Sequence, residues 1–238
     1  MANPFFRFKQ FTVWHDRCAM KVGTDGCLLG AWVTIQETDR NLLDIGTGSG
    51  LIALMLAQRS NAQIDAIDID APSCQQAKEN VARSPFAERI QVYHYPLSSF
   101  SPPLERRYDL IVSNPPYFIQ SLKCPNVTRS QARHADSLPL PDLLNGSLHL
   151  LSDNGRLGLI LPYDQRDLLL KEAIKIGLYP LRETQVSSRV DLPPKRLLIE
   201  LGKEVVTTHH FDKLAIEDLE HNFTPEFIAI ERPFYLKM

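Results

Sequence analysis

One short segment, residues 41–59, constrains the fold more than any other part of the chain. Asn41 to Ile45 is an apolar run that leads into the turn Asp44-Ile45-Gly46-Thr47-Gly48-Ser49-Gly50. Leu51 to Arg59 carries apolar residues at helical spacing, so the segment predicts a strand, a glycine turn and a helix. Alternate glycines let a ligand approach the bare backbone. A dinucleotide fingerprint places its third glycine one residue later, at Leu51, so the turn favours a ligand other than a pyrophosphate.

The segments that follow continue the alternation of strand and helix. Gln63 to Ile67 predicts a second strand, Ala71 to Arg83 a helix and Arg89 to His94 a third strand, which completes a βαβαβ unit. Asp68 follows the second strand, where a carboxylate accepts the ribose hydroxyls of a nucleoside-containing cofactor in this architecture. Asp70 is better placed to cap the next helix.

A second constraint comes from Tyr108-Asp-Leu-Ile-Val-Ser-Asn-Pro-Pro-Tyr117. The apolar first half predicts a buried parallel strand. The strand ends at Pro115 and Pro116, because proline has no amide hydrogen to donate. The Asn114 amide, the Pro115 carbonyl and the Tyr117 ring are then presented together at the carboxyl edge of the sheet, where open α/β sheets bind ligands.

These three groups suit a planar substrate that carries an amine. An exocyclic amine shares its lone pair with a π-system and attacks poorly until acceptors draw its hydrogens aside. The Asn114 side-chain oxygen and the Pro115 carbonyl are two such acceptors, and Tyr117 offers a stacking surface. The same residues also suit a plain strand-ending turn, so a second motif has to decide between the two interpretations.

Length and composition limit the remaining possibilities. A chain of 238 residues with 44% apolar content can bury one sizeable core. A net charge of -2 provides no global basic field, so any nucleic-acid contact has to come from local patches. The four cysteines have no metal-ligand spacing, and the chain shows no signal peptide or membrane span. We therefore expect a cytoplasmic monomer with reduced thiols, no metal and no membrane contact.

Two segments carry local aromatic or positive character. Residues 1–20 interleave aromatic and basic side chains, which suits unpaired RNA but also suits an arm that covers the core, the interpretation we favour. Residues 118–135 contain basic residues and no acid. Lys123, Arg129 and Arg133 in that segment are candidates for contacts with a phosphate-bearing substrate, although a solvated loop would look the same.

The second half of the chain continues with helix, strand and helix over residues 141–151, 155–161 and 163–176. Strands are predicted at Tyr179 to Val186 and at Arg196 to Leu201. Val205 to Lys213 has no regular pattern, and we expect it to be irregular surface. The tail from Thr224 to Met238 predicts a short helix that packs on the core.

The glycine turn and Asn114-Pro-Pro-Tyr117 together resemble the class I S-adenosylmethionine-dependent methyltransferases that modify exocyclic or amide nitrogen. The segments Phe8-Lys-Gln-Phe and His15 to Trp32 give a narrower match, to the bacterial tRNA adenine-N6 methyltransferases. That family modifies the adenosine on the 3′ side of the anticodon of a valine tRNA. The resemblance implies a Rossmann-like α/β fold: a seven-stranded, mostly parallel sheet with helices on both faces and the last strand antiparallel.

The resemblance also implies roles for particular residues. Asp44, Gly46, Gly48 and Gly50 would surround the methionine end of S-adenosylmethionine, Asp68 would hold its ribose, and Lys21 and Thr24 would close over its carboxylate. Asn114, Pro115 and Tyr117 would be catalytic. The chain departs from the pattern at Pro96, where such families carry an acid near the cofactor adenine, and Ser98 or Ser99 would have to replace it.

On this basis we expect an N-terminal arm at 1–40, a methyltransferase core at 41–202 and a C-terminal extension at 203–238. Other functions remain open at this stage, because an amide nitrogen poses the same chemical problem as an adenine amine. The same motifs would serve an N5-glutamine methyltransferase of a release factor or an rRNA guanine-N2 methyltransferase. A dinucleotide oxidoreductase and a non-catalytic RNA-binding module are further alternatives.

Overall fold

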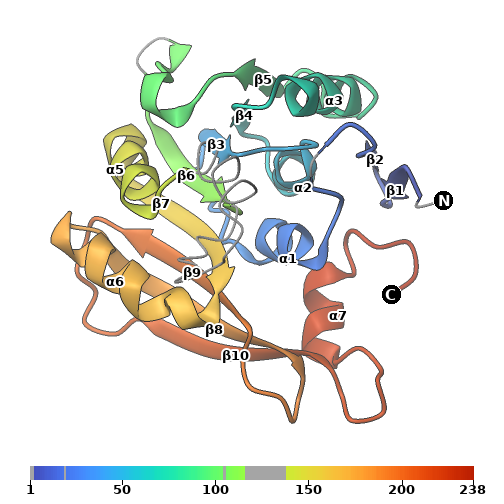
Figure 1. Cartoon of the computed structure of the whole chain (residues 1–238), viewed down its shortest axis with the longest axis vertical. Coiled ribbons are helices and arrows are strands. Elements are labelled where there is room, and N and C mark those ends of the chain that lie inside the picture. The colour runs from blue at the N-terminus through green and yellow to red at the C-terminus, as the bar shows by residue number, and fades with distance from the viewer. Residues whose placement is uncertain (1–2, 19, 104–105, 116–137) are drawn as a thin grey trace, which may run out of the picture.

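The computed structural model describes residues 3–18, 20–103, 106–115 and 138–238. Within these residues, an open eight-stranded sheet forms the centre of the molecule, in the order β10-β8-β9-β7-β6-β3-β4-β5 (Figure 1). Neighbouring strands are parallel except β9, which is antiparallel to β7 and β8. The strands are β3 (Asn41–Ile45), β4 (Gln63–Asp68), β5 (Ile90–His94), β6 (Tyr108–Ser113), β7 (Leu151–Pro162), β8 (Tyr179–Arg189), β9 (Arg196–Gly202) and β10 (His210–Glu217).

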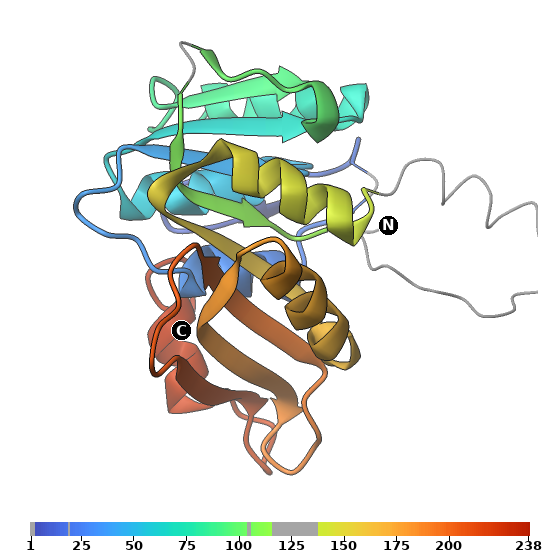
Figure 2. The ribbon, with the colours of Figure 1, turned by 90° about the vertical axis from the view of Figure 1, so that its left-hand side faces the viewer.

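Helices cover both faces of the sheet, because successive strand residues point to opposite sides. Leu42 packs in one apolar cluster with helices α1, α2, α3 and α7, whereas Leu43 packs in the other with α5 and α6 (Figure 2). None of the described helices has the length and apolar content that a bilayer crossing requires. The helices are α1 (Thr24–Trp32), α2 (Leu51–Arg59), α3 (Ala71–Ala82), α5 (Leu140–Leu150), α6 (Arg166–Lys175) and α7 (Pro225–Glu231), with short 3-10 turns η1 (Leu97–Ser99) and η3 (Tyr163–Gln165).

The N-terminal segment forms a small hairpin of β1 (Phe5–Arg7) and β2 (Thr12–Trp14) that lies on the helical layer. Phe8 and Phe11 are buried in the core, and Phe8 also contacts the ring of Tyr235 from the C-terminal tail. The aromatic N-terminus therefore covers the core, as we favoured from the sequence.

The seven-stranded methyltransferase sheet is confirmed, but an eighth strand extends it. Residues from His210 onward form β10 beside β8, so the prediction of irregular structure for Val205 to Lys213 is wrong at its C-terminal end. Most β10 side chains are at least partly exposed and only Leu214 is buried, because the strand lies at the sheet edge. An edge strand of this kind lacks the alternation by which a half-buried strand is recognised. The tail helix is confirmed as α7.

The register of three central strands positions the functional site. Ile45, the last residue of β3, pairs with Ser113 of β6 on one side and with Ile67 of β4 on the other. The Ser113 hydroxyl donates a 2.8 Å hydrogen bond to the Ile45 carbonyl. The glycine turn after β3, the Asn114 segment after β6 and Asp68 at the end of β4 are thus brought to one edge of the sheet.

Replacing Ser113 with alanine removes this tie while leaving the ladder between β3 and β6 in place. We expect Ser113→Ala to lower the free energy of unfolding by about 1 kcal/mol, since a buried hydrogen bond is lost. Urea unfolding would measure the change. Exposed Ser98→Ala is the matched control and should have no effect; equal stability of both variants would contradict a stabilising role for the Ser113 hydroxyl.

Candidate active site

The glycine turn after β3 presents bare backbone to the carboxyl edge of the sheet. Gly46 and Gly48 have φ angles of +73° and +54°, in the left-handed region that side chains disfavour. No described atom lies within 4 Å of the place that a Cβ would occupy at either residue. The turn is therefore open on the side from which a ligand would approach.

Two groups at the end of β4 help to hold the turn in this shape. The amides of Gly46 and Thr47 donate to the Ile67 carbonyl of β4, at 2.9 and 3.0 Å. The Gly48 amide donates to Asp68 Oδ2 at 2.8 Å. Asp68 Oδ1 accepts from the Asp70 amide, and the Asp70 side chain caps α3 through the Ser73 amide. The cap predicted for Asp70 is confirmed, and Asp68 has a structural bond to the turn that the sequence did not indicate.

Asp44 is fully buried beneath the turn. Its Oδ2 accepts from the Thr47 hydroxyl at 2.6 Å and from the Ala53 amide at 3.1 Å, whereas Oδ1 has no hydrogen-bond partner among the described residues. Burial raises the pKa of the Asp44 carboxyl to about 7, and the nearby charge of Asp68 adds to the rise. A buried carboxylate oxygen without a partner is costly, so the site would gain from a ligand that donates a hydrogen bond or a positive charge.

Asn114 lies beside both the glycine turn and the first turn of α1. A Cβ placed on Gly26 would be 3.0 Å from Leu51 Cδ2 and 3.9 Å from Asn114 Nδ2. The Leu51 side chain at the start of α2 and the Asn114 amide therefore both lie close to Gly26. Pro115 is buried directly after it, which fixes where the strand ends.

The structure reaches most of the residues expected at the site. Lys21 and Thr24 are both exposed. Lys21 lies two residues before Gly23, the N-cap of α1, and Thr24 is the first residue of the helix. Tyr117, Lys123, Arg129 and Arg133 lie outside the described residues.

Two exposed apolar side chains at the same edge were not predicted from the sequence. Ile69 and Tyr95 are 48% and 51% exposed and directly follow the paired residues Asp68 and His94. The His94 ring bonds to the Ile69 carbonyl at 2.9 Å, which ties the two strand ends together. A large apolar residue just beyond a strand, next to an acid, is the sequence signal that could have indicated them.

Pro96 occupies the position at which the family resemblance led us to expect an acid. Pro96 is the N-cap of η1, and Ser98 and Ser99 in that turn are both exposed. Hydroxyl groups are thus present near Tyr95, but the edge is less polar than an acid would make it.

Comparison with known proteins identifies the family. Residues 26–162 match the methyltransferase small domain. A tRNA1(Val) (adenine(37)-N6)-methyltransferase from Parabacteroides distasonis is 58% identical over 238 residues, which is 100% of both chains. The chain belongs to the tRNA1(Val) (adenine(37)-N6)-methyltransferase family. Members from Bacteroides fragilis and Trichodesmium erythraeum are 48% and 47% identical, again over 100% of both chains.

Solved structures place the fold of this family member among the methyltransferases. A predicted O-methyltransferase from Agrobacterium tumefaciens superimposes with a TM-score of 0.70 at 16% identity, covering 88% of this chain and 96% of its own. A glycopeptide N-methyltransferase solved with S-adenosyl-L-methionine gives 0.55 at 12% identity, covering 77% of this chain and 100% of its own. The Rossmann-like class I methyltransferase fold expected from the sequence is thereby confirmed.

The raised pKa of Asp44 predicts a pH-dependent contribution to stability. Between its ordinary value of 3.8 and about 7, the folded protein keeps a proton that the unfolded chain has released. The contribution of Asp44 to the free energy of unfolding therefore falls as pH rises through that window and is constant above it. Asp44→Asn removes the titrating group. The free energy of unfolding of the variant should therefore rise by a few kcal/mol relative to that of the wild type as pH increases from about 4 to about 7.

Urea unfolding of both proteins at a series of pH values would measure this difference. Asp153→Asn, at an exposed position, controls for the loss of one negative charge. A wild-type-to-variant difference that stays constant with pH would rule out a raised pKa at Asp44.

Proposed function

We propose that this protein transfers a methyl group from S-adenosylmethionine to N6 of adenine 37, on the 3′ side of the anticodon of a valine tRNA. The observation that carries the proposal is the placement of Asn114-Pro115 beside the glycine turn, on neighbouring parallel strands paired at Ile45 and Ser113. The relatives that are similar over the whole length are named for this activity, which supports the same substrate.

The residues around the turn fit S-adenosylmethionine. Asp44 Oδ1, which has no hydrogen-bond partner within residues 3–115 and 138–238 as far as these are described, suits the positively charged amino group of the methionine part of the cofactor, directly or through water. The open backbone at Gly46 and Gly48 leaves room for the methionine chain and the ribose, and Asp68 is at the edge where the ribose hydroxyls would lie. These residues would hold the cofactor. Lys21 and Thr24 would approach its carboxylate from the α1 side.

The apolar side chains at the ends of β4 and β5 suit the adenine ring of the cofactor. Ile69 and Tyr95 offer surfaces for a flat, weakly polar ring, and burying them recovers hydrophobic free energy. Ser98 or Ser99 would then meet the adenine amine with a hydroxyl in place of a carboxylate. Pro96 itself cannot make that contact with its side chain.

The chemistry needs little beyond positioning. When bound, the cofactor supplies a methyl group already activated by its positively charged sulfur. Asn114 Oδ1 and the Pro115 carbonyl would accept the two N6 hydrogens, which directs the nitrogen lone pair at the methyl carbon. Transfer would form the N6–C bond as the S–C bond of the cofactor breaks, and one N6 proton would pass to solvent. Accurate positioning can supply roughly 7–11 kcal/mol of the barrier.

The RNA would reach this edge with its target base turned out of the stack, which costs least in a loop. Tyr117 is the proposed stacking surface for that base. Lys123, Arg129 and Arg133 are the proposed phosphate contacts.

The direct test is a product analysis. The protein is incubated with S-adenosylmethionine carrying a labelled methyl group and with bulk tRNA from cells that lack this modification. We expect label in N6-methyladenosine, located by nuclease mapping next to a valine anticodon. Label in another nucleoside, or only in a release-factor glutamine, would overturn the proposed substrate.

Asn114→Ala separates catalysis from cofactor binding. Because this variant loses one acceptor for the N6 hydrogens and keeps the glycine turn, we expect methyl transfer to fall by at least about a hundredfold. The Kd for S-adenosylmethionine, measured by calorimetry, should change by less than about threefold. Asn145→Ala on α5 is the control, since its amide is exposed and, in the described part of the chain, bonds only to the Pro141 carbonyl. Full activity of Asn114→Ala would reject its catalytic role.

A further inference from the structure

Asn80 of α3 is a buried polar residue that the proposed chemistry does not use. Its side chain is 0% exposed and makes three hydrogen bonds. Nδ2 donates to the Ser49 carbonyl and to the Trp14 carbonyl, both at 2.8 Å, and Oδ1 accepts from the Trp14 amide at 3.0 Å. Both amide hydrogens are thus used, on two segments that are far apart in sequence.

The bond to Ser49 acts on the glycine turn. Fixing the Ser49 carbonyl fixes the plane of the peptide between Ser49 and Gly50, whose amide donates to the Thr47 carbonyl at 2.9 Å. The turn is thus held by Asp44 through Thr47, by Asp68 through Gly48 and by Asn80 through Ser49. Of these three supports, Asn80 is the one whose remaining hydrogen bonds hold the N-terminal hairpin.

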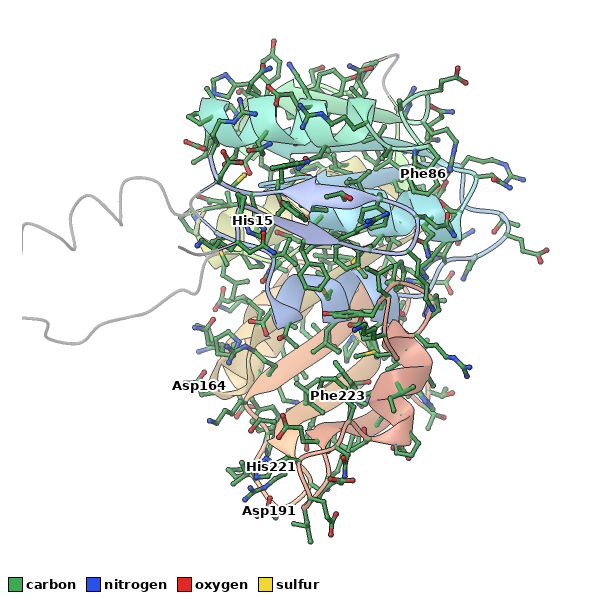
Figure 3. The ribbon with its side chains drawn as sticks, turned by 90° about the vertical axis from the view of Figure 1, so that its right-hand side faces the viewer. His15, Phe86, Asp164, Asp191, His221 and Phe223 are labelled. Atoms are coloured by element: carbon green, nitrogen blue, oxygen red, sulfur yellow. The ribbon has the colours of Figure 1, made fainter. Side chains whose placement is uncertain are left out.

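His15, the residue after Trp14, continues the connection on the other side. Its ring is buried, with Nε2 at 2.9 Å from the Asn3 carbonyl and Nδ1 at 3.3 Å from the Val22 amide. A carbonyl only accepts and an amide N–H only donates, so with these partners Nε2 is the donor and Nδ1 the acceptor. Figure 3 shows His15 where the hairpin borders α1.

Val22 belongs to the segment that leads into α1. It lies between Lys21 and Thr24, the two residues proposed to close over the cofactor carboxylate. The chain of hydrogen bonds therefore runs from the glycine turn through Asn80 to the peptide of Trp14, and from His15 to Val22. It joins two walls of the proposed cofactor site.

We infer that Asn80 and His15 are positioning residues, and that their hydrogen bonds form a brace which sets the spacing between the glycine turn and the Val22–Thr24 wall. The inference rests on the proposed cofactor site and deepens it. The brace acts on cofactor affinity, because both side chains are buried and bond to backbone groups of the two walls.

Two substitutions break the brace at different points. Asn80→Asp keeps the size of the side chain but replaces both N–H donors with an oxygen that faces two carbonyls. His15→Gln can place its amide N–H near the position of Nε2, within reach of the Asn3 carbonyl, but has no acceptor at the position of Nδ1 that serves the Val22 amide. We expect each variant to raise the Kd for S-adenosylmethionine about tenfold. At saturating cofactor, kcat should stay within about threefold of wild type.

The double variant tests whether the two bonds act in series. Once either link is broken, the walls are uncoupled, so the second break should add little. We expect a Kd about tenfold above wild type in the double variant, against about a hundredfold for independent supports. Calorimetric titration with S-adenosylmethionine measures all four proteins.

Two controls distinguish the brace from general destabilisation. Asn145→Asp changes an exposed asparagine on α5 and should leave the Kd unchanged. Leu214→Ala removes buried apolar volume from β10 and should lower Tm, again without changing the Kd.

The opposite results are equally clear. If Asn80→Asp and His15→Gln keep the wild-type Kd and only lower Tm, both residues are structural supports and the brace is overturned. If the two increases in Kd multiply in the double variant, the two contacts act independently, which also overturns the brace. If Asn80→Asp does not fold, His15→Gln alone decides between a raised and an unchanged Kd. Failure of the wild type to bind S-adenosylmethionine would instead overturn the proposed function.

Discussion

The pairing of β3 with β6 is the constraint on which the site depends. Backbone hydrogen bonds fix the relative height of two parallel strands, and here Ile45 is level with Ser113. The next residue on one strand begins the glycine turn, and the next on the other is Asn114. A shift of one residue would carry the amide away from the turn and reverse which side chains face each helical layer. The geometry of the site is therefore set by the register of the sheet.

Around this pairing, buried polar groups hold the glycine turn. The turn contains glycines at positive φ, a conformation that glycine adopts freely, and hydrogen bonds from the surrounding elements select this one arrangement. The fixing groups come from different elements: Asp44 from β3, Asp68 from β4 and Asn80 from α3. Keeping Asp44 buried beneath the turn costs stability, and that cost is sustained at a place where a cationic ligand would offset it.

The sequence predicted the local parts of this arrangement well. Leu51–Arg59 has the same bounds in the structure as in the sequence prediction, because a glycine N-cap and apolar periodicity both act within a few residues. The strand before Asn114 was found for a similar reason, since two prolines end it. Because the carboxyl ends of parallel strands meet at one edge of the sheet, the sequence also predicted that Asp68 and Asn114 lie near the turn.

Other features could not be predicted because they depend on contacts between distant residues. Asn80 is a polar residue on the buried stripe of α3, and periodicity does not say which carbonyls it reaches. The hydrogen bond from the Gly48 amide to Asp68 and the exposure of Ile69 depend on how the end of β4 packs against neighbouring segments. β10 was missed because its side chains carry little alternation. In each case the chain pattern was compatible with several environments, and tertiary packing selected one.

β10 also has a consequence for how copies of this protein behave toward one another. Without it, β8 would end the sheet with an unpaired row of amides and carbonyls, a ready template for association between molecules. β10 replaces that edge with a strand that carries His210, Asp212 and Lys213, and His210 Nε2 lies 2.8 Å from Asp212 Oδ2. Charged edges of this kind discourage strand addition. The C-terminal segment thereby covers the edge of β8, and a chain cut after Gly202 would leave the amides and carbonyls of that edge unpaired.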